Sequence, residues 1–188
     1  MKGSIIVLVA LLCVTALAEG APVDRLTEGN QTYLSTSDAG LREDLAVNGQ
    51  HPYAVVIACS DSRVIPEALF SATFGDLFVI RVAGNVLDDH QMGSVQYAVE
   101  HLGCKDVILL GHTGCGAIGA ALEAGHAEGY VGSIVEDIHE AIGDETDPDR
   151  ASEKNVRYGV ERLREAFPEA DVRGAVFDIA SGEVTWLE

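Results

Sequence analysis

Positive charge is scarce in this 188-residue chain, which has 12 lysine and arginine residues against 30 aspartate and glutamate residues and a formal net charge of −18. Lysine occurs only at Lys2, Lys105 and Lys154. A surface this acidic repels phosphate backbones, so we expect no binding to nucleic acid. Such a surface also suits a salty environment, because screening there weakens the repulsion between like charges.

Long apolar runs are missing as well. The longest, from Ile5 to Leu17, is shorter than the roughly 20 residues that a membrane-spanning helix needs, so we expect no stable membrane span. Lys2 before this run and Ala16-Leu17-Ala18 at its end are typical of an export signal. We therefore predict a signal peptide at residues 1–18 and a single domain at residues 19–188. The protein would be periplasmic or extracellular if the signal works, and cytoplasmic if the run is instead a buried first helix.

Cysteine is limited to four residues, Cys13, Cys59, Cys104 and Cys115. If Cys13 leaves with the signal peptide, an odd number remains, which argues against a purely disulfide framework in an exported protein. Cys104 has no chemically active neighbours and is predicted to be structural. Cys59 and Cys115 are different, because other metal-ligand and charged residues surround them.

Apolar residues make up 47% of the chain, enough for the core of one domain. Short apolar runs alternate with stretches of helical periodicity. The runs predict strands at 53–59, 77–82, 106–111, 172–179 and 183–187, and the periodic stretches predict helices at 25–34, 41–47, 91–102, 114–124, 130–142 and 151–167. This alternation predicts an α/β fold with a mostly parallel central sheet of about four strands plus an edge strand, flanked by helices.

Two of the predicted strands end in unusual chemistry. The first runs into Cys59-Ser60-Asp61-Ser62-Arg63, and the third runs into His112-Thr113-Gly114-Cys115. The carboxyl ends of parallel strands meet at one edge of a sheet, where α/β proteins bind ligands. Two thiolates and one imidazole are a ligand set for catalytic zinc, which keeps a fourth position open. Cys115 also lies at the start of a predicted helix, whose N-terminus favours the thiolate.

Cys59, Asp61 and Arg63 are spaced by two residues, so in an extended chain their side chains point to one side. Arg63 would then hold Asp61 ionised and oriented beside the metal. Taken alone, His112 or Cys59 would more often be an ordinary core residue. Their combination favours a metal site, and a redox disulfide between Cys59 and Cys115 is the main alternative.

These motifs resemble those of the β-class carbonic anhydrase family, and the similarity covers residues 25–188. The segments that carry it are Leu26–Asn30, Ala58–Val64, Phe74–Asn85, Ser94–Val99, Gly111–Gly116, Gly174–Asp178 and Gly182–Val184. The resemblance implies one Zn²⁺ per chain, held by the ligands Cys59, His112 and Cys115. It also implies the catalytic pair Asp61 and Arg63, and reversible hydration of carbon dioxide to bicarbonate and a proton by hydroxide on the zinc.

The resemblance further implies substrate contacts, at Gln50, Phe78, Ala83, Tyr97 and Gly116. Family members build their site across a dimer interface, which implies a homodimer or a larger even homo-oligomer. Phe78, Ala83 and Tyr97 could equally be ordinary core residues.

One position departs from the pattern of some family members, which carry a tryptophan linked to a regulatory bicarbonate pocket. Val56 stands there in this chain, so we expect no such regulation. Two alternative functions remain open at this point. One is a hydrolase of carbon disulfide or carbonyl sulfide on the same fold, and the other is a non-catalytic zinc-binding subunit of an assembly.

Overall fold

The computed structural model describes residues 22–123 and 127–188. The predicted signal peptide at residues 1–18 and Cys13 lie outside the described residues, so they stay predictions. The chain forms two compact units, Met1–Gly40 and Leu41–Glu188. The helices and strands are α1 (Pro22–Thr36), α2 (Ala39–Asn48), β1 (Ala54–Ala58), α3 (Pro66–Leu69), β2 (Leu77–Arg81), the 3₁₀ helix η1 (Ala83–Asn85), α4 (Asp89–His101), β3 (Asp106–His112), α5 (Gly116–Glu123), α6 (Tyr130–Ile142), α7 (Pro148–Ala166), β4 (Asp171–Phe177) and β5 (Val184–Leu187).

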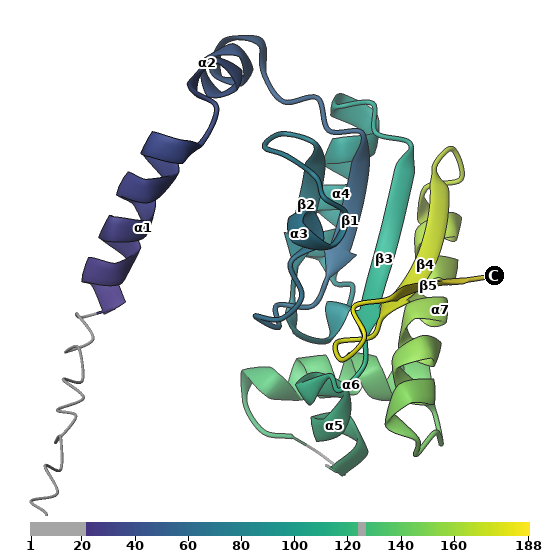
Figure 1. The fold of residues 1–188 in the computed structure, drawn as a ribbon. Coiled ribbons are helices and arrows are strands. Elements are labelled where there is room, and N and C mark those ends of the chain that lie inside the picture. Colours follow the sequence, from purple (N-terminus) through teal and green to yellow (C-terminus); the bar gives the residue numbers. More distant parts are fainter. Residues whose placement is uncertain (1–21, 124–126) are drawn as a thin grey trace, which may run out of the picture. The chain divides into compact units, whose positions relative to one another are not determined.

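The sheet of the second unit has five strands in the order β2-β1-β3-β4-β5 (Figure 1). β1 is parallel to both β2 and β3, and β3 is parallel to β4. Only β5 is antiparallel, and it pairs with β4 at the edge. This arrangement confirms the predicted mostly parallel sheet with an additional edge strand.

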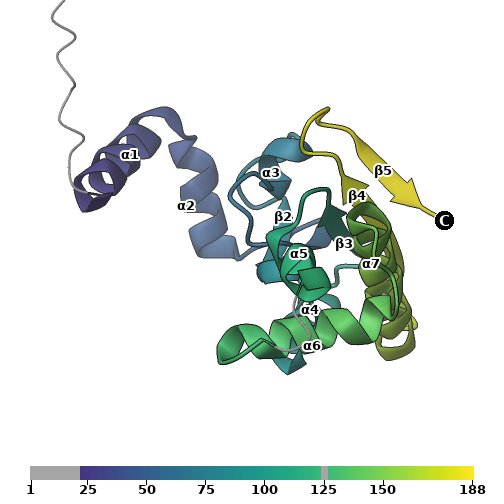
Figure 2. The same cartoon turned by 90° about the horizontal axis from the view of Figure 1, so that it is seen from below.

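The central strands are apolar because both of their faces are covered. Alternate residues of β1 and β3 point to opposite faces. Val55, Ile57, Val107 and Leu109 join a cluster with α4 and α7, whereas Val56, Ala58, Ile108 and Leu110 join a cluster on the α3 side. Figure 2, which looks along the sheet from below, shows α3 on one side and α4 with α7 on the other.

A third apolar cluster packs α5 and α6 against the end of the sheet where β1 and β3 finish, and Figure 1 shows both helices at that end of the strands. Ile118 of α5 and Val135 and Ile138 of α6 belong to this cluster, and so do Cys59 and Cys115. The residues at the carboxyl edge of the sheet are therefore closely packed, and this packing holds the side chains of Cys59 and Cys115 in fixed positions.

The two helices that cover one face of the sheet, α4 and α7, each have an aspartate as their N-cap residue. The Asp88 side chain accepts hydrogen bonds from the backbone N–H groups at the start of α4, and Asp147 does the same for Arg150 in α7. Pro148 occupies the first turn of α7, where its missing N–H costs nothing. These caps satisfy N–H groups that have no partner within the helix.

No helix in the described part of the chain is both long and apolar enough to cross a membrane.

Two short elements, α3 and η1, were not expected from the sequence pattern. Both are too short for a helical periodicity to show. Within η1, Gly84 has φ +69° and Asn85 has φ +44°, so the turn depends on two residues in the left-handed region. Asn85 tolerates this conformation better than most residues with a side chain.

Gly159 of α7 lets this helix pack directly against the sheet. A Cβ atom at this position would overlap the buried side chain of Leu109 and would lie 3.3 Å from Leu87 Cδ1. We expect Gly159→Val to lower the free energy of unfolding by about 1–3 kcal/mol through overpacking. Gly93→Val in α4 is the matched control, because nothing lies within 4 Å of a Cβ there. Equal urea midpoints for the two variants would contradict this account of α7 packing.

Candidate metal centre

Three metal-ligand side chains meet at the carboxyl edge of the sheet. Cys59 directly follows β1, His112 is the last residue of β3, and Cys115 lies just before α5. Because β1 and β3 are adjacent parallel strands, their ends lie side by side. The ligand atoms of the three residues lie within 4.8 Å of one another. All three side chains are buried. The sequence predicted this trio, and the fold brings it together.

The chemistry of these donors fits a metal ion. His112 Nδ1 lies 3.0 Å from the Thr113 carbonyl oxygen, so this nitrogen donates and Nε2 keeps its lone pair. Among the described residues Nε2 is buried and has no hydrogen-bond partner, and such an atom is costly to bury unless something binds it. Cys59 and Cys115 are free thiols rather than a disulfide. Two sulfurs and one imidazole make a three-ligand set that suits zinc and leaves a fourth position open.

The two cysteines are electrostatically linked. A hydrogen bond from the Cys115 thiol lowers the pKa of Cys59 to about 4, although burial acts in the opposite direction. The backbone N–H groups of Asp61 and Gly84 lower it further. The hydrogen bond to Cys59 and burial both raise the pKa of Cys115. A metal ion binds cysteine as the thiolate, so an ion bound to both sulfurs would displace the proton of Cys115.

Asp61 and Arg63 form the predicted ion pair next to Cys59. The Arg63 side chain donates to both carboxylate oxygens, from Nε to Oδ1 at 2.9 Å and from Nη2 to Oδ2 at 2.7 Å. The backbone N–H of Arg63 also donates to Oδ1 at 2.9 Å. These bonds hold the pKa of Asp61 far below its usual range, so this side chain is a carboxylate at neutral pH.

Arg63 also connects the two loops that carry the metal ligands. Its Nη2 donates to the carbonyl oxygen of Gly114 at 3.2 Å, between His112 and Cys115. The side chain of Asp61 is only 17% exposed, whereas that of Arg63 is 52% exposed. A fixed carboxylate therefore stands at the rim of the buried trio, held by a guanidinium that reaches solvent.

Sequence reasoning missed Arg81, the last residue of β2. Its guanidinium donates to the carbonyl oxygen of Cys59 at 3.1 Å and to that of Asp61 at 2.7 Å. The only signal in the sequence is a charged residue inside an apolar strand. Here the charged side chain hydrogen-bonds the backbone of the loop between Cys59 and Arg63 and holds that loop in place.

The residues predicted to contact substrate fall into two groups. Gly116 begins α5 next to Cys115, and Ala83 begins η1, so both lie close in the chain to groups of the metal centre. Phe78 and Tyr97 instead contact each other, with ring centroids 6.2 Å apart. Phe78 also packs against the core cluster shared with α4 and α7.

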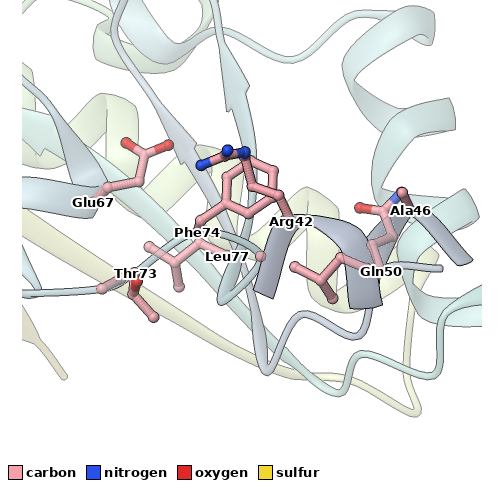
Figure 3. Close-up of a pocket in the computed structure, with 10 residues that line it drawn as sticks. Arg42, Ala46, Gln50, Glu67, Thr73, Phe74 and Leu77 are labelled. Atoms are coloured by element: carbon pink, nitrogen blue, oxygen red, sulfur yellow. The ribbon is translucent and has the colours of Figure 1, made fainter. Parts of the chain in front are cut away.

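Gln50 follows α2 and lines a separate cavity of about 640 Å³. Arg42, Glu67 and Phe74 line the same cavity (Figure 3). None of the three metal ligands lines it. Within one chain, the described structure therefore does not bring Gln50 to the metal trio.

Comparison with known proteins agrees with this site. The family model described as carbonic anhydrase matches residues 54–184. Carbonic anhydrase 2 of Mycobacterium tuberculosis is 39% identical over 123 residues, which cover 62% of this chain and 59% of that protein. The chain thus matches about three fifths of the length of this curated relative.

Solved structures agree over most of the fold. The β-carbonic anhydrase CafA of Aspergillus fumigatus superposes with a TM-score of 0.76 at 28% identity, covering 89% of this chain and 91% of that one. One of the two tetrameric β-carbonic anhydrases of Sordaria macrospora superposes with a TM-score of 0.74 at 30% identity, covering 88% and 95%. With the family match over most of its length and the trio at the edge of its sheet, the chain belongs to the β-class carbonic anhydrase family.

Proposed function

We propose that this protein catalyses the reversible hydration of carbon dioxide to bicarbonate and a proton, with one zinc ion per chain. The observation that carries the proposal is the buried trio of Cys59, His112 and Cys115 beside a fixed carboxylate, in a chain of the carbonic anhydrase family. When bound, zinc supplies a Lewis acid that makes a nucleophile of water at neutral pH, an effect for which carbonic anhydrases with three histidine ligands are the standard example.

Asp61 is suited to orient the attacking water. Its Oδ1 already accepts two hydrogen bonds, whereas Oδ2 accepts one. A carboxylate oxygen offers about two lone-pair sites, so Oδ2 can accept one more bond. Because Arg63 holds the carboxylate in place and ionised, no reorganisation is needed when the reaction begins.

We further propose that the working site is shared between two copies in a homodimer or a larger even assembly. In one chain Gln50 lines a cavity apart from the metal ligands, so a second copy would have to bring it to them. The tetrameric relatives from Sordaria macrospora support a closed assembly of this kind. The exposed apolar side chains of Val23, Leu26 and Leu34 on α1 offer surface for such an interface.

Cys115→Ala should abolish zinc binding and activity, because it removes one of three ligands. Cys104→Ala is the matched control. Cys104 is also buried, but its sulfur donates to the carbonyl oxygen of Pro52 and takes no part in the trio. Metal analysis of purified protein should find about one zinc per chain in the control and none in Cys115→Ala. Full zinc content in Cys115→Ala would remove this residue from the site.

Asp61→Asn should keep zinc but lower the rate of carbon dioxide hydration by roughly 100-fold or more, since a misplaced reacting group costs about that much. Asp171→Asn is the control, because Asp171 and Arg173 form the same two-point pair at the start of β4. Stopped-flow assays of carbon dioxide hydration with zinc-loaded protein should find the control unimpaired. The same assay with carbon disulfide as substrate distinguishes a carbonic anhydrase from the alternative hydrolase. A fully active Asp61→Asn enzyme is incompatible with the proposed role.

A mixing experiment tests whether the site is shared. Gln50→Ala and Cys115→Ala should each be impaired, for different reasons. A heterodimer of the two has one site with both an intact metal trio and an intact Gln50. Random re-association of such dimers should restore about a quarter of the wild-type rate. Activity no higher than the mean of the separate variants would place each site within one chain.

A further inference from the structure

Cys59 receives a hydrogen bond from a turn that belongs to neither metal-binding loop. The backbone N–H of Gly84, in η1, donates to Cys59 Sγ at 3.3 Å. Gly84 is buried and has φ +69°. A Cβ atom at this position would lie 3.0 Å from Ile138 Cδ1 and 3.1 Å from Ala117 Cβ. Only glycine fits this conformation and this space together, so the N–H approaches the sulfur from a tightly enclosed turn.

The other side of Gly84 is held by α7. Asn155 Nδ2 donates to the Gly84 carbonyl oxygen at 2.9 Å, across 71 residues of sequence. Asn155 is only 6% exposed and lies between the apolar residues Ala151 and Val156 on the buried face of the helix. A buried amide is costly unless it is hydrogen-bonded, so the bond to Gly84 gives this residue a defined partner.

We propose that Asn155 is a positioning residue for the metal ligand Cys59, acting through Gly84. This inference rests on the proposed function, because it assumes that Cys59 binds the metal. The N–H and the carbonyl of Gly84 belong to the two peptide groups that flank its Cα, and glycine has no side chain to limit rotation between them, so a bond that fixes the carbonyl also restricts the direction of the N–H. Asn155 fixes that carbonyl, and the N–H is thereby aimed at the sulfur.

The hydrogen bond to sulfur has two consequences for the metal centre. It orients the Cys59 side chain before the metal arrives, and it withdraws charge from the sulfur once the metal is bound. Groups that act on metal ligands in this way typically change metal affinity by about 10–100-fold. Asn155 would therefore influence the metal without touching it.

The test compares Asn155→Ala with Ser152→Ala. Ser152 is also a buried polar residue of α7, but its Oγ has no hydrogen-bond partner among the described residues. Zinc affinity is measured by competition with a chelator, and the cobalt-substituted proteins are examined for the sulfur-to-cobalt charge-transfer band. Asn155→Ala should bind zinc about 10–100-fold more weakly and show a displaced band, whereas Ser152→Ala should match the wild type in both.

Unchanged affinity and an unchanged band in Asn155→Ala would overturn the inference. Asn155→Leu, which refills the space without a donor, covers the case in which the alanine variant fails to fold. If neither variant folds, or if both lose thermal stability while zinc affinity and the cobalt band stay unchanged, Asn155 is a packing residue and the inference is wrong. Wild-type protein that binds no zinc would instead overturn the proposed function, so the two failures can be told apart.

Discussion

The metal centre depends on the parallel pairing of β1 with β3. In this register Ala58 lies opposite Leu110, so Cys59 and His112 emerge at the same edge of the sheet. Antiparallel pairing would send the two side chains to opposite ends of the sheet. Cys115 then follows because Gly114, with φ +62°, turns the chain back within a few residues. The pairing of the strands therefore determines where Cys59 and His112 lie, and the turn at Gly114 brings Cys115 to them.

Burial and charge are divided unequally across the site. The three donors are buried, and a metal ion bound to them would replace the solvation that they lose. The ion pair of Asp61 and Arg63 stands at the rim, where Arg63 still reaches water.

The sequence was sufficient for the sheet and for the donors, because both leave local patterns. Apolar runs such as Ala54–Ala58 predict buried strands, and the ligand residues directly follow them. What it could not predict were bonds between distant backbone groups and side chains. Arg81 clamps the loop after β1, and Asn155 holds Gly84 from α7. Neither interaction leaves a periodic pattern in the sequence, because each forms only when separate helices and strands have packed together.

X-ray absorption at the zinc edge counts and identifies the atoms around the metal in the loaded protein. We expect two sulfur atoms at about 2.3 Å and lighter nitrogen or oxygen neighbours at about 2.0–2.1 Å, one of them from imidazole. Four sulfur neighbours, no sulfur neighbours, or a metal-free protein with Cys59 bonded to Cys115 would contradict it.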